Sequence, residues 1–145
     1  MDQILYWNAV ALESDRKAHT EIDPAEPGPR DPIGRSRALA IVHLAMHDAI
    51  FSIFGAPHGT WLTAPPVAAT GALPDAAIAV AAHTTLSALY PAQTTRLDNA
   101  LRTAGLRGRA DLSQHIGGVR LGRDVADDLW AAGLRQDQAA GPRVP

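Results

Sequence analysis

Two histidines and an aspartate inside the most apolar stretch of the sequence are the residues best placed for chemistry. His43 and His47 are four residues apart, so on a helix both imidazoles would lie on one face, where they could share a metal ion. Asp48 is turned by about 100° from His47 around such a helix and makes a poor third ligand. No glutamate follows His43, so the metalloprotease signature is absent. We therefore expect buried, hydrogen-bonded histidines with a structural role, and a metal site is the alternative.

The other polar residues lie in settings that do not indicate catalysis. No serine lies in a Gly-x-Ser-x-Gly motif, and a chain without cysteine has no thiol nucleophile or thiolate ligand. We expect His83 to form a hydrogen bond between helices. Three isolated histidines are expected at the surface or in packing contacts: His19, His58 and His115. Five charged residues near the C-terminal end are expected on a solvated helix face: Arg120, Arg123, Asp124, Asp127 and Asp128.

An all-α bundle of about five helices is expected to position these residues, because the apolar runs have helical periodicity and none alternates as a strand does. The second helix is apolar nearly all round, which is typical of the central helix of a bundle. A long connection over residues 55–73 follows the second helix, and Trp61 is expected to pin this connection to the body of the bundle. The expected helices cover approximately residues 3–19, 34–55, 74–90, 91–105 and 111–134.

Small residues recur every four positions in the last expected helix, at Gly118, Gly122 and Ala126. Such a stripe lets a second helix approach closely. The glycines do not follow a strand, so they do not form a dinucleotide-binding turn. We expect one helical domain over residues 1–138 and a tail or linker over residues 139–145.

Composition excludes several classes of protein. The chain has 145 residues, of which 46% are hydrophobic and 19% charged, with a net charge of −2 and no basic run. A globular domain without a nucleic-acid partner is therefore expected. Polar residues interrupt any signal-peptide pattern at the N-terminus, and His43, His47 and Asp48 within the most apolar run argue against a membrane span. These features predict a cytoplasmic protein.

Four segments of the sequence carry a family resemblance when they are taken in order. They are Ile4–Glu13 (ILYWNAVALE), Arg37–Met46 (RALAIVHLAM) with Asp48-Ala49 after it, Ala81–Ala92 (AAHTTLSALYPA) and Gly118–Asp127 (GVRLGRDVAD). From about Ile4 to Asp137 the chain resembles the helical N-terminal region of bacterial vanadium-dependent haloperoxidases, relatives of type-2 phosphatidic acid phosphatases. His47 departs from the pattern, since most relatives have a tyrosine there.

The resemblance implies that the bundle is half of a larger α-helical fold. In that family a lysine, arginines and a Ser-Gly-His segment hold the vanadate oxygens, and a histidine nitrogen bonds the vanadium, all C-terminal to the matched region. This sequence has no Ser-Gly-His, and its single lysine, Lys17, has no Arg-Pro at the family's spacing. No catalytic, cofactor-binding or metal-binding residue of the family can be assigned to a position of this chain.

The resemblance therefore implies a non-catalytic N-terminal helical subunit of a haloperoxidase. A separate partner chain would bind vanadate, oxidise halide with hydrogen peroxide and so halogenate organic substrates. Four other helices offer too few neighbours for the second helix, so we expect an obligate hetero-oligomer. Whether this chain counts as an enzyme is left open. One alternative is a stand-alone helical binding or scaffold protein that lost the chemistry. The other is a metal-binding enzyme that uses His43 and His47.

Overall fold

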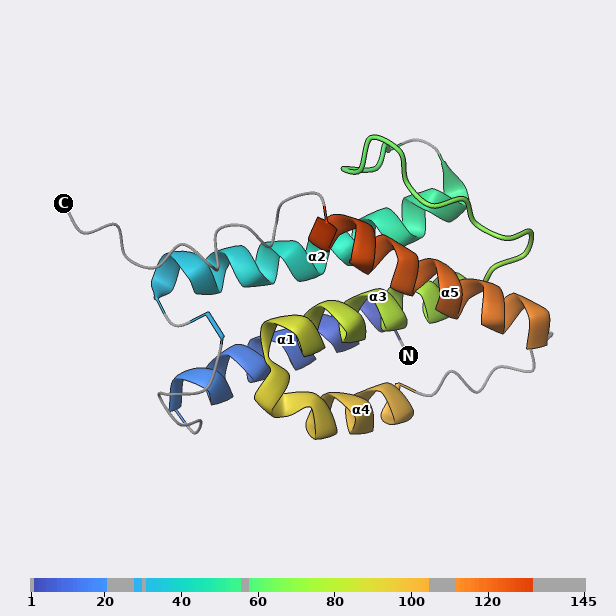
Figure 1. Ribbon diagram of the computed structural model, residues 1–145. Coiled ribbons are helices and arrows are strands. Elements are labelled where there is room, and N and C mark those ends of the chain that lie inside the picture. Colours follow the sequence, from blue (N-terminus) through green and yellow to red (C-terminus); the bar gives the residue numbers. More distant parts are fainter. Residues whose placement is uncertain (1, 21–27, 30, 56–57, 105–111, 132–145) are drawn as a thin grey trace.

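The computed structural model describes residues 2–20, 28–29, 31–55, 58–104 and 112–131, and within these it is helical with no strand (Figure 1). The expected all-α fold is confirmed. The helices are α1 (Gln3–Thr20), α2 (Pro32–Phe54), α3 (Pro74–Leu89), the 3₁₀ turn η1 (Pro91–Gln93), α4 (Thr94–Thr103) and α5 (Leu112–Leu129). The predicted end of the fourth helix at residue 105, the predicted end of the last helix at residue 134 and the tail at residues 139–145 lie outside the described residues.

Local sequence determines where α2 begins and ends. The Asp31 carboxylate accepts a hydrogen bond of 2.9 Å from the Gly34 N–H, and Pro32 occupies the first turn, where a missing N–H costs nothing. This is why α2 begins two residues earlier than predicted. At the other end Gly55 has a positive φ of 73°, and its N–H donates to the Phe51 carbonyl at 2.8 Å. A glycine adopts this backbone without the steric cost of a side chain.

The helix at the centre of the bundle is α3, and the prediction that the second helix is central is wrong. Figure 1 shows α3 in the middle of the bundle, and it contacts α1, α2, α4 and α5. Alanine makes this possible, because α3 buries five alanines that let neighbours approach on several sides: Ala76, Ala77, Ala79, Ala81 and Ala82. In contrast, α2 contacts only α1, α3 and α5 appreciably, and one of its faces is left open.

The predicted close packing of the last helix is confirmed. A Cβ atom at Gly122 would lie 2.3 Å from the Ala77 carbonyl oxygen, and one at Gly118 would lie 2.5 Å from the Leu73 oxygen. The backbones of α5 and α3 are therefore too close for any side chain at these two positions. Val125 and Leu129 then fill the space between α5, α3 and α2.

A second cluster of apolar side chains joins α1, α2, α3 and α4. Its largest fully buried members are Trp7, Met46, Leu86, Leu89 and Leu97. Among the described residues, α2 is also the one helix long and apolar enough to cross a bilayer by length and composition. Core helices meet the same criterion, and the burial of Asp48 within α2 agrees with a core helix.

Candidate functional site

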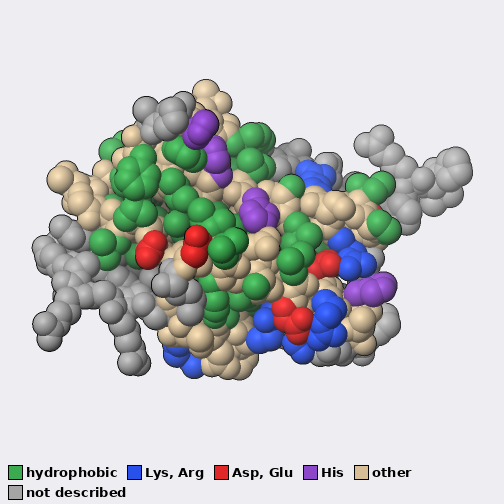
Figure 2. All heavy atoms as spheres, turned by 180° about the vertical axis from the view of Figure 1, so that it is seen from behind, with side chains coloured by type: hydrophobic (Ala, Val, Ile, Leu, Met, Phe, Trp, Pro, Cys, Tyr) green, Lys and Arg blue, Asp and Glu red, His purple; other side chains and the backbone are tan. Residues whose placement is uncertain are grey.

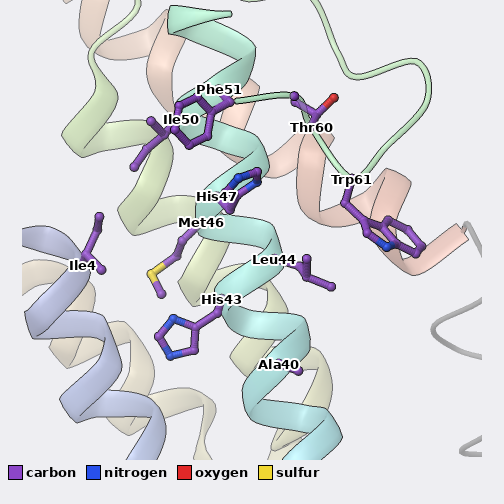
Figure 3. A pocket seen from close by; sticks show the side chains of 11 residues that line it. Ile4, Ala40, His43, Leu44, Met46, His47, Ile50, Phe51, Thr60 and Trp61 are labelled. Carbon is purple, nitrogen blue, oxygen red and sulfur yellow. The ribbon is translucent and has the colours of Figure 1, made fainter. Parts of the chain in front are cut away.

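An open groove of about 810 Å³ lies along α2, between α1 and the connection that follows α2 (Figure 3). Residues spaced three or four apart on α2 form its floor, and Ile4 of α1 and the segment Gly59–Trp61 form its sides. The α2 residues are Ala40, His43, Leu44, Met46, His47, Ile50 and Phe51. None of the residues that line the groove is Asp, Glu, Lys or Arg. Such a surface is suited to apolar contacts, with a few polar groups that fix orientation.

The two histidines of α2 lie in this groove, and the expectation that they are buried is wrong. His43 is exposed, and the His47 side chain is 39% exposed. Both are nevertheless hydrogen-bonded, as expected: His43 Nε2 lies 3.0 Å from Asn8 Oδ1 on α1, and His47 Nδ1 lies 3.0 Å from Asp48 Oδ1. In Figure 3, His43 is directed toward α1. The two histidines are exposed because they lie on the open side of α2, and the apolar sequence pattern does not show which side of a helix is open.

A metal site at these histidines has no support in the geometry. Within the described residues no group of three His, Asp or Glu side chains is placed to hold one ion. Instead the aromatic rings of this face contact one another. The His47 and Phe51 ring centroids are 4.7 Å apart, and those of Phe51 and His58 are 5.2 Å apart.

Asp48 fixes one side of the groove, a role that the sequence did not reveal to us. Its carboxylate is fully buried and accepts hydrogen bonds of 2.8 Å from the backbone N–H groups of Trp61 and Leu62. The connection is therefore anchored through its backbone and the buried Leu62 side chain. The predicted anchor, the Trp61 side chain, is 49% exposed, so that prediction is wrong. The sequence did contain a signal for this anchoring role: an aspartate within the most apolar helix. A carboxylate that is buried there requires hydrogen-bond donors nearby.

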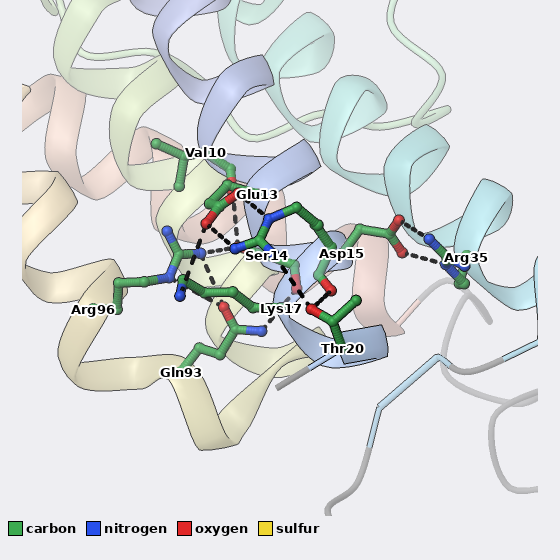
Figure 4. Close-up of polar contacts among 10 residues, drawn as sticks. Val10, Glu13, Ser14, Asp15, Lys17, Thr20, Arg35, Gln93 and Arg96 are labelled. Atoms are coloured by element: carbon green, nitrogen blue, oxygen red, sulfur yellow. Dashed lines mark hydrogen bonds and ion pairs between the residues drawn. The ribbon is translucent and has the colours of Figure 1, made fainter. Parts of the chain in front are cut away.

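A separate polar cluster joins α1 to α4 (Figure 4). Gln93 Nε2 donates to the Ser14 carbonyl at 2.8 Å, and the Arg96 guanidinium donates to the Ser14 hydroxyl and to Gln93 Oε1. Burial lowers the pKa of Arg96. Nearby, Arg16 holds Glu13 in a pair of 2.8 Å hydrogen bonds, which lower the pKa of that carboxyl to about 2.

Two further polar contacts join helices. Arg35 of α2 donates to both oxygens of Asp15 of α1, at 2.8 and 2.6 Å, and this pairing raises the pKa of Arg35. His83 Nε2 of α3 lies 2.8 Å from Asp98 Oδ1 of α4, which confirms the predicted hydrogen bond between helices.

The remaining sequence predictions concern surface residues. His19 and His58 are exposed as expected, and the His115 side chain lies outside the described residues. On α5 the predicted solvated face is confirmed, because its charged residues are exposed or half-buried and Arg120 Nε lies 3.9 Å from Asp124 Oδ2.

All the helices that build the groove lie within a segment that matches a known family. The model of the vanadium chloroperoxidase N-terminal domain matches residues 1–116, which is most of the chain. The chain belongs to this family. The vanadium chloroperoxidase of Curvularia inaequalis is 35% identical over 153 aligned residues, which cover 88% of this chain and 24% of that protein. The chain thus spans about a quarter of the length of this relative.

The family implies vanadate, and the described residues do not fit it. A vanadate ion carries several negative charges and needs converging cations and hydrogen-bond donors. Among the cations with described contacts, Arg16, Lys17 and Arg96 lie around the Glu13 carboxylate. With a pKa of about 2 this carboxylate is ionised near neutral pH and would repel an oxyanion. No step of vanadate chemistry can be derived from these side chains.

Proposed function

We propose that this chain is the N-terminal helical part of a vanadium-dependent haloperoxidase and that it packs against a part that binds vanadate. The observation that carries the proposal is the match to a family named as an N-terminal domain, in a chain that corresponds to 24% of its relative. The contacts of Arg16, Lys17 and Arg96 support it, because these side chains bind Glu13, Ser14 and Gln93 of this chain.

In this proposal the chain contributes packing and no catalytic group. The vanadate-binding part oxidises halide with hydrogen peroxide, and the oxidised halogen then halogenates organic substrates. The helices of this chain hold that part in place and limit the access of water to it. In its finer form the proposal places the vanadate-binding part on a separate polypeptide, in a cytoplasmic hetero-oligomer with this chain.

A halogenation assay tests the proposal. The purified chain, given vanadate, hydrogen peroxide and bromide, should show no turnover above that of free vanadate. Addition of the vanadate-binding part should give activity, and mass spectrometry of the undenatured assembly should show equal copies of the two. Turnover by the chain alone would refute the absence of a catalytic group. A protein isolated from its own cells without any attached vanadate-binding sequence, either fused or as a partner, would refute the assignment to a haloperoxidase.

A further inference from the structure

The outer side of α2 is an apolar surface without a neighbour among the described residues. Only 39% of the most apolar stretch of 18 residues in α2 is buried, although the stretch is apolar nearly all round. Figure 2 shows hydrophobic side chains gathered over this side of α1 and α2, with histidines among them. Large side chains are exposed here and nearby: Ile4 is 41% exposed, Trp61 49% and Phe54 60%. Contiguous apolar surfaces of this kind usually mark interfaces.

Two other outward surfaces of the described bundle, those of α4 and α5, are polar. On α4 the exposed residues are threonines, an asparagine and an arginine: Thr94, Thr95, Asn99, Arg102 and Thr103. On α5 the exposed residues after the close contact with α3 are mostly charged: Arg120, Arg123, Asp127 and Asp128. Neither surface is suited to an extensive apolar contact. A large partner would therefore find apolar contacts in the groove along α2 and on α1, which also exposes Leu5 and Leu12 at 67% and 50%.

The groove has the dimensions and chemistry of a site for one helix. From Ala40 to Phe51, α2 lines it over about 16 Å, or three helical turns. Residues spaced three and four apart offer the ridges and grooves into which a second helix packs. His43 uses Nε2 on Asn8 and His47 uses Nδ1 on Asp48, so among the described residues the other nitrogen of each ring is left for a polar group of the partner.

We propose that this groove docks a helix of the vanadate-binding part of the enzyme. This inference rests on the proposed function. It adds which face of the chain makes the contact, the groove along α2, and what that face binds, a helix. The chain corresponds to 24% of its relative, so the remaining three quarters of such a protein supplies the occupant. Because the groove carries no charged residue, the docked helix presents apolar side chains, with a hydrogen-bonding group opposite His43 or His47. Asp48 keeps the groove in shape, since it holds Trp61 and Leu62 beside α2.

Single cysteines test the contact, because the chain has none of its own. Ala40→Cys places a thiol in the groove, and Ala88→Cys places a matched thiol at an exposed position of α3 outside it. Each variant is treated with a maleimide, alone and in the assembly with the vanadate-binding part. Mass spectrometry of the peptides then identifies the labelled residue. In the isolated chain both thiols should react at similar rates. In the assembly the Ala40→Cys thiol should react at least about tenfold more slowly, because labelling then requires the interface to open, and the Ala88→Cys thiol should be unaffected.

The outcomes separate this inference from the proposed function. If native mass spectrometry shows no assembly, the proposed function fails. If the assembly forms and the groove thiol still reacts quickly, the function stands and the docking surface is wrong. Protection of the groove thiol in the isolated chain would also overturn the inference: a monomer would indicate another segment of this chain as the occupant, and a dimer would indicate a second copy. Protection by phosphatidylcholine vesicles alone would indicate a membrane surface and overturn it as well.

Discussion

Replacement of Asp48 by asparagine should loosen the connection that forms one side of the groove. The aspartate carboxylate offers one oxygen to the Trp61 N–H and the other to the Leu62 N–H, each at 2.8 Å. Asparagine has nearly the same volume, but only one of its two terminal atoms accepts a hydrogen bond. The amide nitrogen would therefore face a backbone N–H, with donor opposite donor.

The expected magnitude follows from counting these bonds. One hydrogen bond to a buried charge is lost, which should lower the free energy of unfolding by about 2 kcal/mol in Asp48→Asn. Asp48→Ala loses both bonds to the backbone as well as the contact with His47, and it should cost about 4 kcal/mol, because the buried Leu62 N–H and the half-buried Trp61 N–H then have no acceptor. For a domain of this size, about 2 kcal/mol corresponds to a fall in melting temperature of roughly 6 °C.

Two measurements check this prediction. Urea denaturation gives the free energy of unfolding, with Asp127→Asn as a control at an exposed position, which should change it by no more than about 0.5 kcal/mol. Amide hydrogen exchange should also be about thirtyfold faster at Trp61 and Leu62, if the loss of about 2 kcal/mol acts through local opening of the connection. If the free energy and these two exchange rates in Asp48→Asn match those of the parent, the carboxylate does not anchor the connection.

Two other substitutions test packing and electrostatics. Gly122→Ala places a Cβ 2.3 Å from the Ala77 carbonyl oxygen and should lower the free energy of unfolding by about 3 kcal/mol. Gly59→Ala meets nothing within 4 Å and should change it by less than about 0.5 kcal/mol; equal effects of the two would contradict the close contact of α5 with α3. Glu13 has its pKa lowered to about 2 by Arg16, so its contribution to stability is complete above about pH 4.5 and is lost as the pH falls toward 2. Urea denaturation between about pH 4.5 and 2 should show that the free energy of unfolding falls more steeply in the parent than in Glu13→Gln. If the free energy of unfolding depends on pH in the same way in both proteins, Glu13 does not contribute as described.

The sequence predicted the helices well because their determinants are local. Pro74 and Gly55 mark a start and an end through backbone chemistry that neighbours in space do not alter. The close contact of α5 was also predictable, since Gly118 and Gly122 leave no side chain that could keep two backbones apart. The family match followed from segments in these same helices.

The arrangement of the helices was less predictable, because it depends on competition between apolar faces. Both α2 and α3 are apolar nearly all round, and periodicity alone does not say which one lies at the centre. Alanine content decides it, since the small side chains of α3 admit four neighbours and the bulkier Leu44, Ile50 and Phe51 of α2 do not. The anchoring by Asp48 was missed for a similar reason, because its partners are backbone N–H groups that no side-chain pattern marks.

The error about His43 and His47 has a physical cause that connects it to the proposed docking. An apolar pattern records how a helix is buried in its complete assembly, whereas the described chain supplies neighbours for only part of α2. Ala40, Leu44 and Phe51 lie on the open side, and they contribute to the apolar pattern from which burial was inferred. Their exposure costs free energy in water unless another surface covers them. In the proposed assembly a docked helix covers these side chains, and the two imidazoles then occupy the buried, hydrogen-bonded positions that the sequence pattern indicated.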